Sequence, residues 1–350
     1  MKNTTLIILA ISLLMACKES PKADKNATST PSVASSPRND AAKMPSDAVQ
    51  SGGVQLVSIE TPKGKFKVWT KKFGDNPRIK ILLLHGGPAM THEYMECFES
   101  FFPKEGFEMY EYDQLGSYYS DQPNDDDLWK TERFVEEVEQ VRLALGMNKD
   151  NFYLLGNSWG GILAMEYALK YQKNMKGLII SNMMASIPDY EKYNLVLRGQ
   201  MRKSLVDSLM AFENKGDLKN PIYTDLVTKE YYNQHICRLP EWPDGVNRAF
   251  KHLNEHVYVL MQGPSEFKVG GRLLTWNIKN QLKNITVATL AIGAKYDTMD
   301  PKAMEDISKS VAKGRFLYCA NGSHLCFWDD QKTYFTGVNQ FIKDVDAGKF

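Results

Sequence analysis

A serine between two glycines offers the clearest chemistry in this chain of 350 residues. Ser158 lies at the centre of the sequence Gly-Asn-Ser-Trp-Gly (residues 156–160), directly after the apolar run 152–155. A strand that turns sharply into a helix brings two backbone segments close together, so larger side chains at the glycine positions would collide. The turn is strained and exposes the serine hydroxyl to a base. The pattern therefore predicts a nucleophilic serine at a strand-to-helix turn.

A serine hydroxyl needs a base to remove its proton, and the base needs an acid that fixes its tautomer. Asp297 follows the apolar segment 287–293, and His324 follows the strand-like segment 315–319. Residues that follow strands of one sheet can meet at its edge. We therefore expect Asp297 as the acid and His324 as the base.

Other residues fit these two roles less well. Asp300 is the competing acid, but Pro301 directly after it indicates that Asp300 caps a helix. The remaining histidines that follow the serine are His235, His252 and His256, and all three lie in a helical insertion.

The tetrahedral intermediate of such a reaction needs N–H donors for its oxyanion. The backbone N–H of Trp159, the residue after the serine, is one expected donor. The second is expected from the sequence His-Gly-Gly-Pro at residues 85–88, which follows an apolar strand, and Gly87 is the best donor there. We expect His85 to fix this loop rather than to react.

Alternating strands and helices must position these residues. Strand-like segments lie at 54–59, 66–70, 79–84, 107–112, 152–155, 177–181, 287–293 and 315–319. Helical segments lie at 131–145, at 162–171, after Pro301 and at 332–345. The continuously apolar run 81–84 indicates a strand buried on both faces of a parallel sheet. The alternation predicts an α/β fold with a mostly parallel sheet flanked by helices.

The alternation stops between about residues 185 and 275, where helical periodicity continues without strands. We divide the folded part into a first core segment (54–184), a helical cap (185–275) and a second core segment (276–350). A helical insertion in an α/β domain is expected over the carboxyl ends of the strands, where ligands bind. The cap would then shape the pocket and limit entry.

The first 53 residues have a different character. An apolar stretch from Leu6 to Met15 follows Lys2, and its length fits a secretory signal rather than a membrane-spanning helix. Residues 14–17, Leu-Met-Ala-Cys, resemble a bacterial lipobox, which implies a signal peptide over 1–17 and lipidation of Cys17. Residues 18–53 are rich in Ser, Ala, Pro, Lys and Asp, which predicts a disordered tether.

These features imply a protein that is exported and bound to the membrane of the bacterial cell envelope through lipid on Cys17. Lys18 and Glu19 after this cysteine favour the outer membrane. An ordinary cleaved signal or an uncleaved anchor would also fit, and either would still export the protein.

The remaining cysteines are Cys97, Cys237, Cys319 and Cys326. Cys319 and Cys326 flank one loop and could form a bridge, but the spacings match no disulfide or metal framework, so we expect buried free thiols.

The net charge is +1 and there is no basic tract with interleaved aromatic residues, so a nucleic-acid partner is not expected. The sequence does not indicate the oligomeric state.

Four segments together resemble the proline iminopeptidase family of serine exopeptidases: His85-Gly86-Gly87-Pro88, Tyr112-Asp113-Gln114-Leu115-Gly116, Gly156-Asn157-Ser158-Trp159-Gly160-Gly161 and Gly322-Ser323-His324. The resemblance extends from about Val54 to the end of the chain. It implies an α/β-hydrolase fold with a helical cap, no metal and no cofactor. It also implies release of amino-terminal proline, or another small or apolar residue, from short peptides with a free amino terminus through an acyl-enzyme.

The same resemblance assigns roles to single residues. It implies that Ser158, Asp297 and His324 form a catalytic triad. The segment 261–267 is similar to the cap of the tricorn-interacting aminopeptidase, and this similarity implies that Glu266 binds the α-ammonium group of the substrate. A buried ammonium needs an anionic partner, so such a pair can select an exopeptidase. Glu266 could instead be a charge on the cap surface.

Three positions depart from the family pattern. Thr298 stands where the tricorn-interacting relative has a second ammonium-binding glutamate. Ala89 replaces the glycine that usually ends the oxyanion motif, and Tyr118 replaces a glycine after Gln114. We expect the last two changes to add bulk near the pocket mouth.

One further motif matches a different chemistry. His252-Leu253-Asn254-Glu255-His256 spells H-x-x-E-H, a zinc peptidase pattern that places two histidines one helical turn apart. The motif lies in the cap among polar residues, and the sequence identifies no third ligand, so we expect a solvated helix.

Besides the aminopeptidase, the sequence is also compatible with a lipid-anchored esterase or amidase of the same fold and with a non-catalytic binding lipoprotein.

Overall fold

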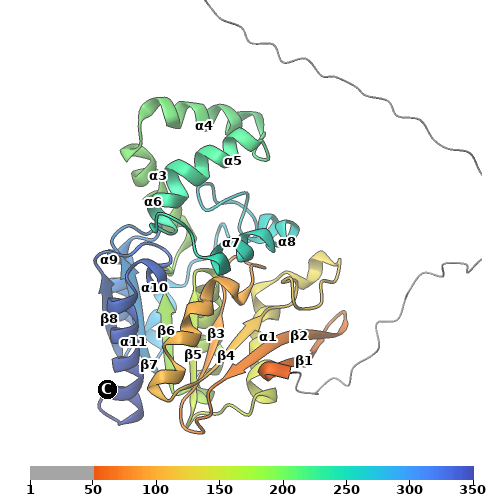
Figure 1. Ribbon diagram of the computed structural model, residues 1–350, viewed down its shortest axis with the longest axis vertical. Coiled ribbons are helices and arrows are strands. Elements are labelled where there is room, and N and C mark those ends of the chain that lie inside the picture. Colours follow the sequence, from red (N-terminus) through yellow and green to blue (C-terminus); the bar gives the residue numbers. More distant parts are fainter. Residues whose placement is uncertain (1–50) are drawn as a thin grey trace, which may run out of the picture. The chain divides into compact units, whose positions relative to one another are not determined.

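A single eight-stranded sheet is the centre of the computed structural model, which describes residues 51–350 (Figure 1). The strands lie in the order β1-β2-β4-β3-β5-β6-β7-β8. Their bounds are β1 Val54–Thr61, β2 Gly64–Phe73, β3 Lys80–Leu84, β4 Glu108–Asp113, β5 Phe152–Asn157, β6 Gly177–Ser181, β7 Ala288–Ala294 and β8 Gly314–Cys319. Strands β3 to β8 pair in parallel, whereas β2 is antiparallel to both β1 and β4. The prediction of a mostly parallel sheet is confirmed.

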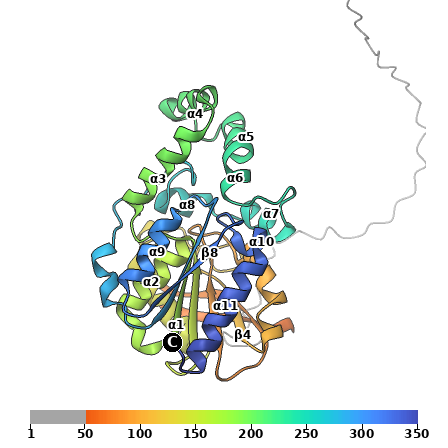
Figure 2. The same cartoon turned by 90° about the vertical axis from the view of Figure 1, so that its left-hand side faces the viewer.

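Helices cover both faces of the sheet. One face packs against α1 (Thr131–Ala144), α2 (Trp159–Tyr171) and α9 (Pro301–Ser310). The other packs against the 3-10 helix η2 (His92–Ser100), α10 (Cys326–Asp329) and α11 (Gln331–Asp346). Figure 2 shows α1, α2 and α9 on one side of the sheet and α11 on the other.

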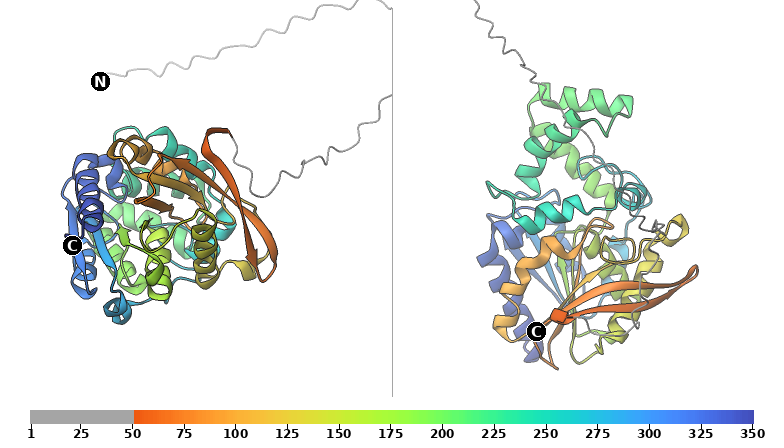
Figure 3. Two further views of the ribbon diagram at one scale, coloured as in Figure 1. Left: turned by 90° about the horizontal axis from the view of Figure 1, so that it is seen from below. Right: turned by 45° about the vertical axis from the view of Figure 1, so that its right-hand side comes forward.

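The apolar run in β3 serves both of these layers. Successive side chains of a strand point to opposite faces. Leu82 and Leu84 therefore join the core under α1, α2 and α9, whereas Ile81 and Leu83 join the core under η2 and α11. The four side chains are fully or almost fully buried, as expected for a central strand of a parallel sheet. At the antiparallel edge, the β1–β2 hairpin extends past the other strands (Figure 3).

A helical cap is inserted between β6 and β7, at the end of the molecule where the parallel strands have their carboxyl ends (Figure 1). Its helices are α3 Ile187–Gln200, α4 Lys203–Lys215, α5 Pro221–Val227, α6 Asn233–His235, α7 Asp244–Lys251 and α8 Glu255–Met261. Leu197, Leu209, Tyr231 and Phe267 belong to a small hydrophobic core inside the cap. From residue 262 the chain returns to β7 through turns and a 3-10 helix, Lys279–Asn284.

The amino-terminal predictions fall largely outside the described part of the chain. The expected signal peptide, the lipidation site Cys17 and residues 18–50 of the expected tether all lie there. Residues 51–53, also assigned to the tether, form a 3-10 turn that leads into β1. Within residues 51–350, no helix is both long enough and apolar enough to cross a membrane.

Candidate active site

Ser158 occupies the turn between β5 and α2, with the left-handed φ of 57° that a strained turn requires. The two flanking glycines are needed for close approach of the backbone. A Cβ atom on Gly156 would lie 1.9 Å from the main-chain oxygen of Gly160, and one on Gly160 would lie 2.1 Å from that of Leu84. The predicted strand-to-helix turn is therefore present, and it carries the serine at the carboxyl edge of the sheet.

Asp297 and His324 meet at the same edge, after β7 and β8. His324 Nδ1 lies 2.7 Å from Asp297 Oδ1, and both side chains are buried. Nδ1–H then donates to the carboxylate, which leaves Nε2 free to accept a proton. Burial alone would lower the pKa of His324, but the charge and the hydrogen bond of Asp297 outweigh it and raise the pKa above its ordinary value.

Three further groups hold the Asp297 carboxylate. Asn182 Nδ2 donates to Oδ2 at 2.7 Å, the backbone N–H of Met299 donates to Oδ1 at 3.1 Å, and the Thr298 hydroxyl donates to Oδ1 at 3.3 Å. Sequence reasoning missed Asn182. Its only signal is its position directly after β6, at the edge where the other site residues follow their strands.

The cap reaches down to the loop that carries His324. The backbone N–H of His324 donates to the main-chain oxygen of His235, and that of Leu325 donates to the main-chain oxygen of Ile236, both at 2.9 Å. His235 Nδ1 also lies 2.8 Å from the main-chain oxygen of Tyr296, the residue before Asp297. Residues 235 and 236 of the cap thus contact both the acid loop and the histidine loop.

The two expected oxyanion donors are the backbone N–H groups of Trp159 and Gly87. Trp159 is the first residue of α2, where a backbone N–H has no partner within the helix. The N–H of Gly86 donates to the Tyr94 hydroxyl at 2.6 Å. Gly87, the next residue, lines the same cavity as Ser158, and no acceptor among residues 51–350 takes its N–H. This geometry leaves the N–H of Gly87 open to a substrate oxygen.

His85 fixes the loop, as expected. Its ring is fully buried, with Nδ1 donating to the main-chain oxygen of Gly86 at 2.8 Å and Nε2 accepting from the backbone N–H of Gln114 at 3.1 Å. Burial lowers the pKa of His85 and keeps the ring neutral, in the state that these two bonds require.

A cavity of about 800 Å³ lies between the sheet edge and the cap, and it contains both Ser158 and His324. Most of its wall is apolar or aromatic, with contributions from Met90, Tyr94, Tyr232, Ile236, Phe250, Leu253, Tyr258, Val259, Pro264 and Leu325. Such a wall suits a small apolar side chain rather than a charged one.

Glu266 supplies a carboxylate to this cavity. Tyr258 donates to Oε1 at 2.7 Å, and the Tyr190 hydroxyl lies 3.0 Å from Oε2. No lysine, arginine or histidine within residues 51–350 forms an ion pair with it. A half-buried carboxylate held by neutral donors and facing a cavity is a site for a cationic group. It therefore does not behave as an ordinary charge on the cap surface.

The departures from the family pattern lie elsewhere than we expected. Neither Ala89 nor Tyr118 belongs to the cavity wall. Ala89 is buried with a φ of 59°, and Tyr118 stacks on the His252 ring with the ring centroids 3.9 Å apart. Neither side chain therefore adds bulk to the cavity wall, and an effect at the pocket mouth stays a prediction. Thr298 is fully buried beside Asp297.

The H-x-x-E-H motif does not form a metal site in the structure. α7 ends at Lys251 and α8 begins at Glu255, so the two histidines do not share a helix face. His252 Nδ1 lies 2.8 Å from Glu93 Oε2, whereas His256 Nε2 lies 2.7 Å from Asp126 Oδ1. In the described part of the chain, no three His, Cys, Asp or Glu side chains are grouped to hold a metal. The cysteines at 97, 237, 319 and 326 are buried free thiols, as predicted.

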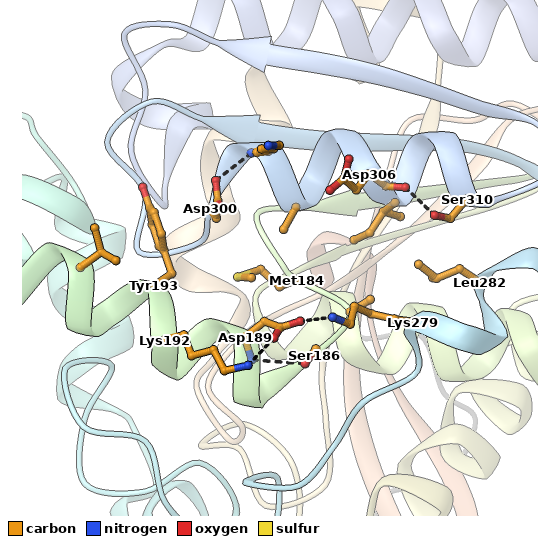
Figure 4. A pocket seen from close by; sticks show the side chains of 15 residues that line it. Met184, Ser186, Asp189, Lys192, Tyr193, Lys279, Leu282, Asp300, Asp306 and Ser310 are labelled. Carbon is orange, nitrogen blue, oxygen red and sulfur yellow. Dashed lines mark hydrogen bonds and ion pairs between the residues drawn. The ribbon is translucent and has the colours of Figure 1, made fainter.

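A second, smaller cavity of about 380 Å³ lies between α3 and α9 (Figure 4). The carboxylate of Asp189 lies between the amines of Lys192 and Lys279 and bonds to both. Asp300 accepts from the backbone N–H of Lys302 at 2.9 Å, so it caps α9, as predicted. The carboxylates of Asp189 and Asp300 thus already have partners within the protein. Ser158 is not among the residues that line this cavity.

Known proteins resemble this chain in sequence and in fold. Residues 80–331 match the model of a family described as alpha/beta hydrolase fold. The chain is 65% identical over 295 residues to a proline iminopeptidase of Flavobacterium johnsoniae, with 84% of this chain and 99% of that protein covered. It is 35% identical over 266 residues to a proline iminopeptidase of Saccharolobus solfataricus, with 76% and 85% covered. The crystal structure of a proline iminopeptidase from Mycobacterium smegmatis superposes with a TM-score of 0.75 at 27% identity, with 84% of this chain and all of that chain covered.

Proposed function

The chain belongs to the proline iminopeptidase family of α/β hydrolases, and on this premise we propose that it is a serine exopeptidase that releases amino-terminal proline from short peptides. The observation that carries the proposal is the shared cavity of Ser158, His324 and Glu266. It brings a candidate nucleophile and base together with an unpaired carboxylate, and this is what cleavage next to a free amino terminus requires.

In the proposed mechanism, the hydroxyl oxygen of Ser158 attacks the carbonyl carbon of the first peptide bond while His324 Nε2 takes the hydroxyl proton. Asp297 holds the imidazole and stabilises its protonated form. The backbone N–H groups of Gly87 and Trp159 donate to the oxyanion, and each such donor is worth about 10²- to 10³-fold in kcat.

His324 then passes its proton to the leaving amine, and the first residue stays on Ser158 as an ester. A water molecule, deprotonated by His324, attacks this acyl-enzyme and releases the residue. Glu266 holds the ammonium group of the substrate throughout, which fixes the scissile bond one residue from the amino terminus.

Arylamides of proline, alanine and acetyl-proline test this proposal. We expect the enzyme to cleave the proline arylamide and to leave the acetylated one, which lacks a cationic amine. Ser158→Ala should abolish turnover and labelling by a fluorophosphonate, whereas Ser208→Ala, an exposed serine of α4, should change neither. Preference for the acetylated substrate would instead identify an esterase or amidase of this fold.

The amine site has its own test. Glu266→Gln keeps the size of the side chain but removes its charge, so KM should rise about tenfold or more for substrates with a free amine. Glu230→Gln, which removes a cap carboxylate that pairs with Arg202, is the matched control. An equal loss with amino-blocked substrates would remove Glu266 from this role.

We also propose that the protein is exported and held at the cell envelope, in the outer membrane, by lipid on Cys17. The support is the apolar stretch and lipobox-like residues 14–17 followed by a polar segment. Cells that express the full chain should incorporate labelled fatty acid into it and retain it in the membrane fraction. Cys17→Ser should lose both, and retention of the label would contradict the proposal.

A further inference from the structure

We propose that the side-chain amide of Gln114 is a positioning group for the oxyanion hole. It joins the segment that carries the Gly87 N–H to the residue that carries the Trp159 N–H, and it thereby fixes the distance between the two donors. The inference rests on the proposed function, in which these two N–H groups bind the oxyanion of an acyl transfer to Ser158.

Gln114 directly follows β4, is fully buried and forms hydrogen bonds on two sides. Its Oε1 accepts from the indole Nε1 of Trp159 at 2.7 Å, and its Nε2 donates to the main-chain oxygen of His85 at 3.0 Å. The backbone N–H of Gln114 also donates to His85 Nε2 at 3.1 Å. One residue thus binds both the first residue of α2 and the loop that carries Gly87.

The two partners of this side chain call for a group that accepts and donates at once. An indole N–H can only donate, and a main-chain oxygen can only accept. A side-chain amide serves both partners, whereas a carboxylate or an apolar side chain does not. Gln114, Trp159 and His85 are all buried, so a lost bond would leave a polar group without bulk water to replace its partner.

The bonds of Gln114 add to a direct contact between the two donor segments. A Cβ atom on Gly160 would lie 2.1 Å from the main-chain oxygen of Leu84, so the start of α2 touches the end of β3 there. A single contact leaves two segments free to rotate about it, and each further contact restricts that rotation. The orientation matters because both N–H groups must lie within hydrogen-bonding distance of one oxyanion position.

Gln114 is the link between these segments that can be changed without altering the pocket. A comparable link runs through the Tyr94 hydroxyl, which accepts from the Gly86 N–H at 2.6 Å and donates to Asn157 Oδ1 at 3.0 Å. Tyr94 lines the cavity, whereas Gln114 is not among the described residues that do so. A change at Gln114 therefore reaches a substrate through the donors and not through the cavity wall.

Gln114→Met keeps the length of the side chain and removes both of its hydrogen bonds. We expect kcat for prolyl arylamide to fall about 10- to 100-fold with little change in KM, because displaced donors weaken binding of the transition state more than that of the substrate. The midpoint of the pH profile on the acid side should not move, because Gln114 bonds to the oxyanion segments and not to His324 or Asp297.

Gln172→Met is the matched control. This glutamine follows the other end of α2, and its amide also joins two segments, since Nε2 donates to the main-chain oxygen of Asn284 at 2.8 Å and Oε1 accepts from the backbone N–H of Thr286 at 2.6 Å. Its loss should leave kcat unchanged. An equal fall of kcat in both variants would indicate a general effect on the fold and overturn the inference.

Two ligands report on the oxyanion hole directly. The boron of pyrrolidine-2-boronic acid accepts the Ser158 oxygen while His324 takes the hydroxyl proton, and the tetrahedral anion that results places an oxygen in the hole. Pyrrolidine has the same ring amine and no such oxygen. Gln114→Met should raise the Ki of the boronic acid about as much as it lowers kcat and leave the Ki of pyrrolidine unchanged. Equal changes in the two Ki values, or no change in either, would overturn the inference.

Trp159→Phe provides a second test, and it also serves if Gln114→Met does not fold, as judged by circular dichroism. It removes only the indole donor, so kcat should fall about three- to tenfold and the ratio of the two Ki values should rise. Trp276→Phe, which removes an indole N–H bonded to Glu166 at 2.7 Å, should change neither. Trp159→Phe should add little to Gln114→Met, because both break the same bond. An unchanged Ki ratio or fully additive losses would contradict the inference.

Failure of the proposed function would look different. The unmodified enzyme would then cleave acetyl-proline arylamide or a simple ester in place of prolyl arylamide. The oxyanion hole serves any acyl transfer to Ser158, so kcat with that substrate and the Ki of methylboronic acid would then decide the inference. Turnover that survives Ser158→Ala, or no turnover of any of these substrates, would remove both the proposed function and the inference.

Discussion

Asn182 Nδ2 donates a 2.7 Å hydrogen bond to Oδ2 of Asp297, the carboxylate oxygen that His324 does not use. The two oxygens of Asp297 are thus divided between the imidazole on one side and an amide on the other. Asn182 itself has a φ of 55°, a left-handed conformation that asparagine tolerates better than most residues. It also donates to the main-chain oxygen of Ser323 at 3.3 Å, next to His324.

This relationship predicts that Asn182 positions the acid. Asn182→Gly keeps the left-handed backbone and removes only the amide, so we expect kcat to fall about 10- to 100-fold, as for loss of one bond to a charged group. Asn182→Asp should be worse, because it places a second carboxylate against Asp297. Steady-state kinetics with circular dichroism as a check on folding measures both. A glycine variant with unchanged kcat would show that Asp297 needs no such support.

Asp297→Asn should lower kcat by about 10⁴-fold with little change in KM. An asparagine can donate to His324 Nδ1 and so favour the wrong tautomer of the imidazole. Asp300→Asn is the matched control, since this residue caps α9 and contacts neither His324 nor Ser158. A loss of equal size in the control would mean that the effect comes from the fold of this loop and not from the imidazole.

The pH dependence of activity should follow the raised pKa of His324. The imidazole acts as a base only when neutral, so kcat/KM falls as pH falls through this pKa, which lies above the ordinary value of 6.5. The stabilising pair of protonated His324 and Asp297 has the opposite dependence. It is fully present below the ordinary pKa and is lost as pH rises through the raised one. A profile of kcat/KM between about pH 5 and 9 measures the fall in activity on the acid side. A midpoint of this fall below pH 6.5 would contradict a raised pKa of His324.

Glu111 should make the protein less stable at alkaline pH. This carboxylate on β4 is fully buried, neither oxygen has a hydrogen-bond partner among residues 51–350, and burial raises its pKa to about 8. The basic group nearest to it is the His92 ring, whose Nε2 lies 3.9 Å from Oε2. The folded state therefore holds a proton that the unfolded state releases near pH 4.5, and stability is lost as pH rises from there to about 8.

Glu111→Gln removes this titration. The free energy of unfolding of the variant relative to the wild type should increase from about pH 6 to about pH 8, by up to ~1.4 kcal/mol per pH unit, and level off above pH 8. Tm values measured between about pH 6 and pH 9 follow this trend. Glu132→Gln, an exposed carboxylate of α1, should show no such trend. Parallel Tm curves for wild type and Glu111→Gln would mean that Glu111 is charged throughout this range.

The sequence predicts the sheet and the central part of the site well, because both depend on local patterns. Apolar runs mark the strands, and Ser158, Asp297 and His324 each follow one. Parallel strands bring their carboxyl ends to one edge, so Asp297 and His324 meet, and Ser158 lines the same cavity as His324, although the three are far apart in the chain. Gly87 reaches the same edge of the sheet for the same reason, because its loop follows β3.

The rest of the site depends on packing that no local pattern records. Asn182 has one polar neighbour in sequence and its important partner 115 positions away. The two tyrosines on Glu266 come from α3 and α8, and only the folded cap brings them together. The break between His252 and His256 did carry a signal, because Asn254 accepts a hydrogen bond from the N–H of Val257 and begins a new helix there.

The bonds between residues 235–236 of the cap and the His324 loop limit how a substrate can enter. If the whole cap swung away from the core, it would break backbone bonds of the histidine that must take the serine proton. A movement that keeps these bonds is therefore confined to other parts of the cap. Lys219 and Glu255 both line the cavity and form an exposed 3.5 Å ion pair, which in water is worth at most about 1 kcal/mol. Loss of this pair would leave the backbone bonds of the His324 loop intact.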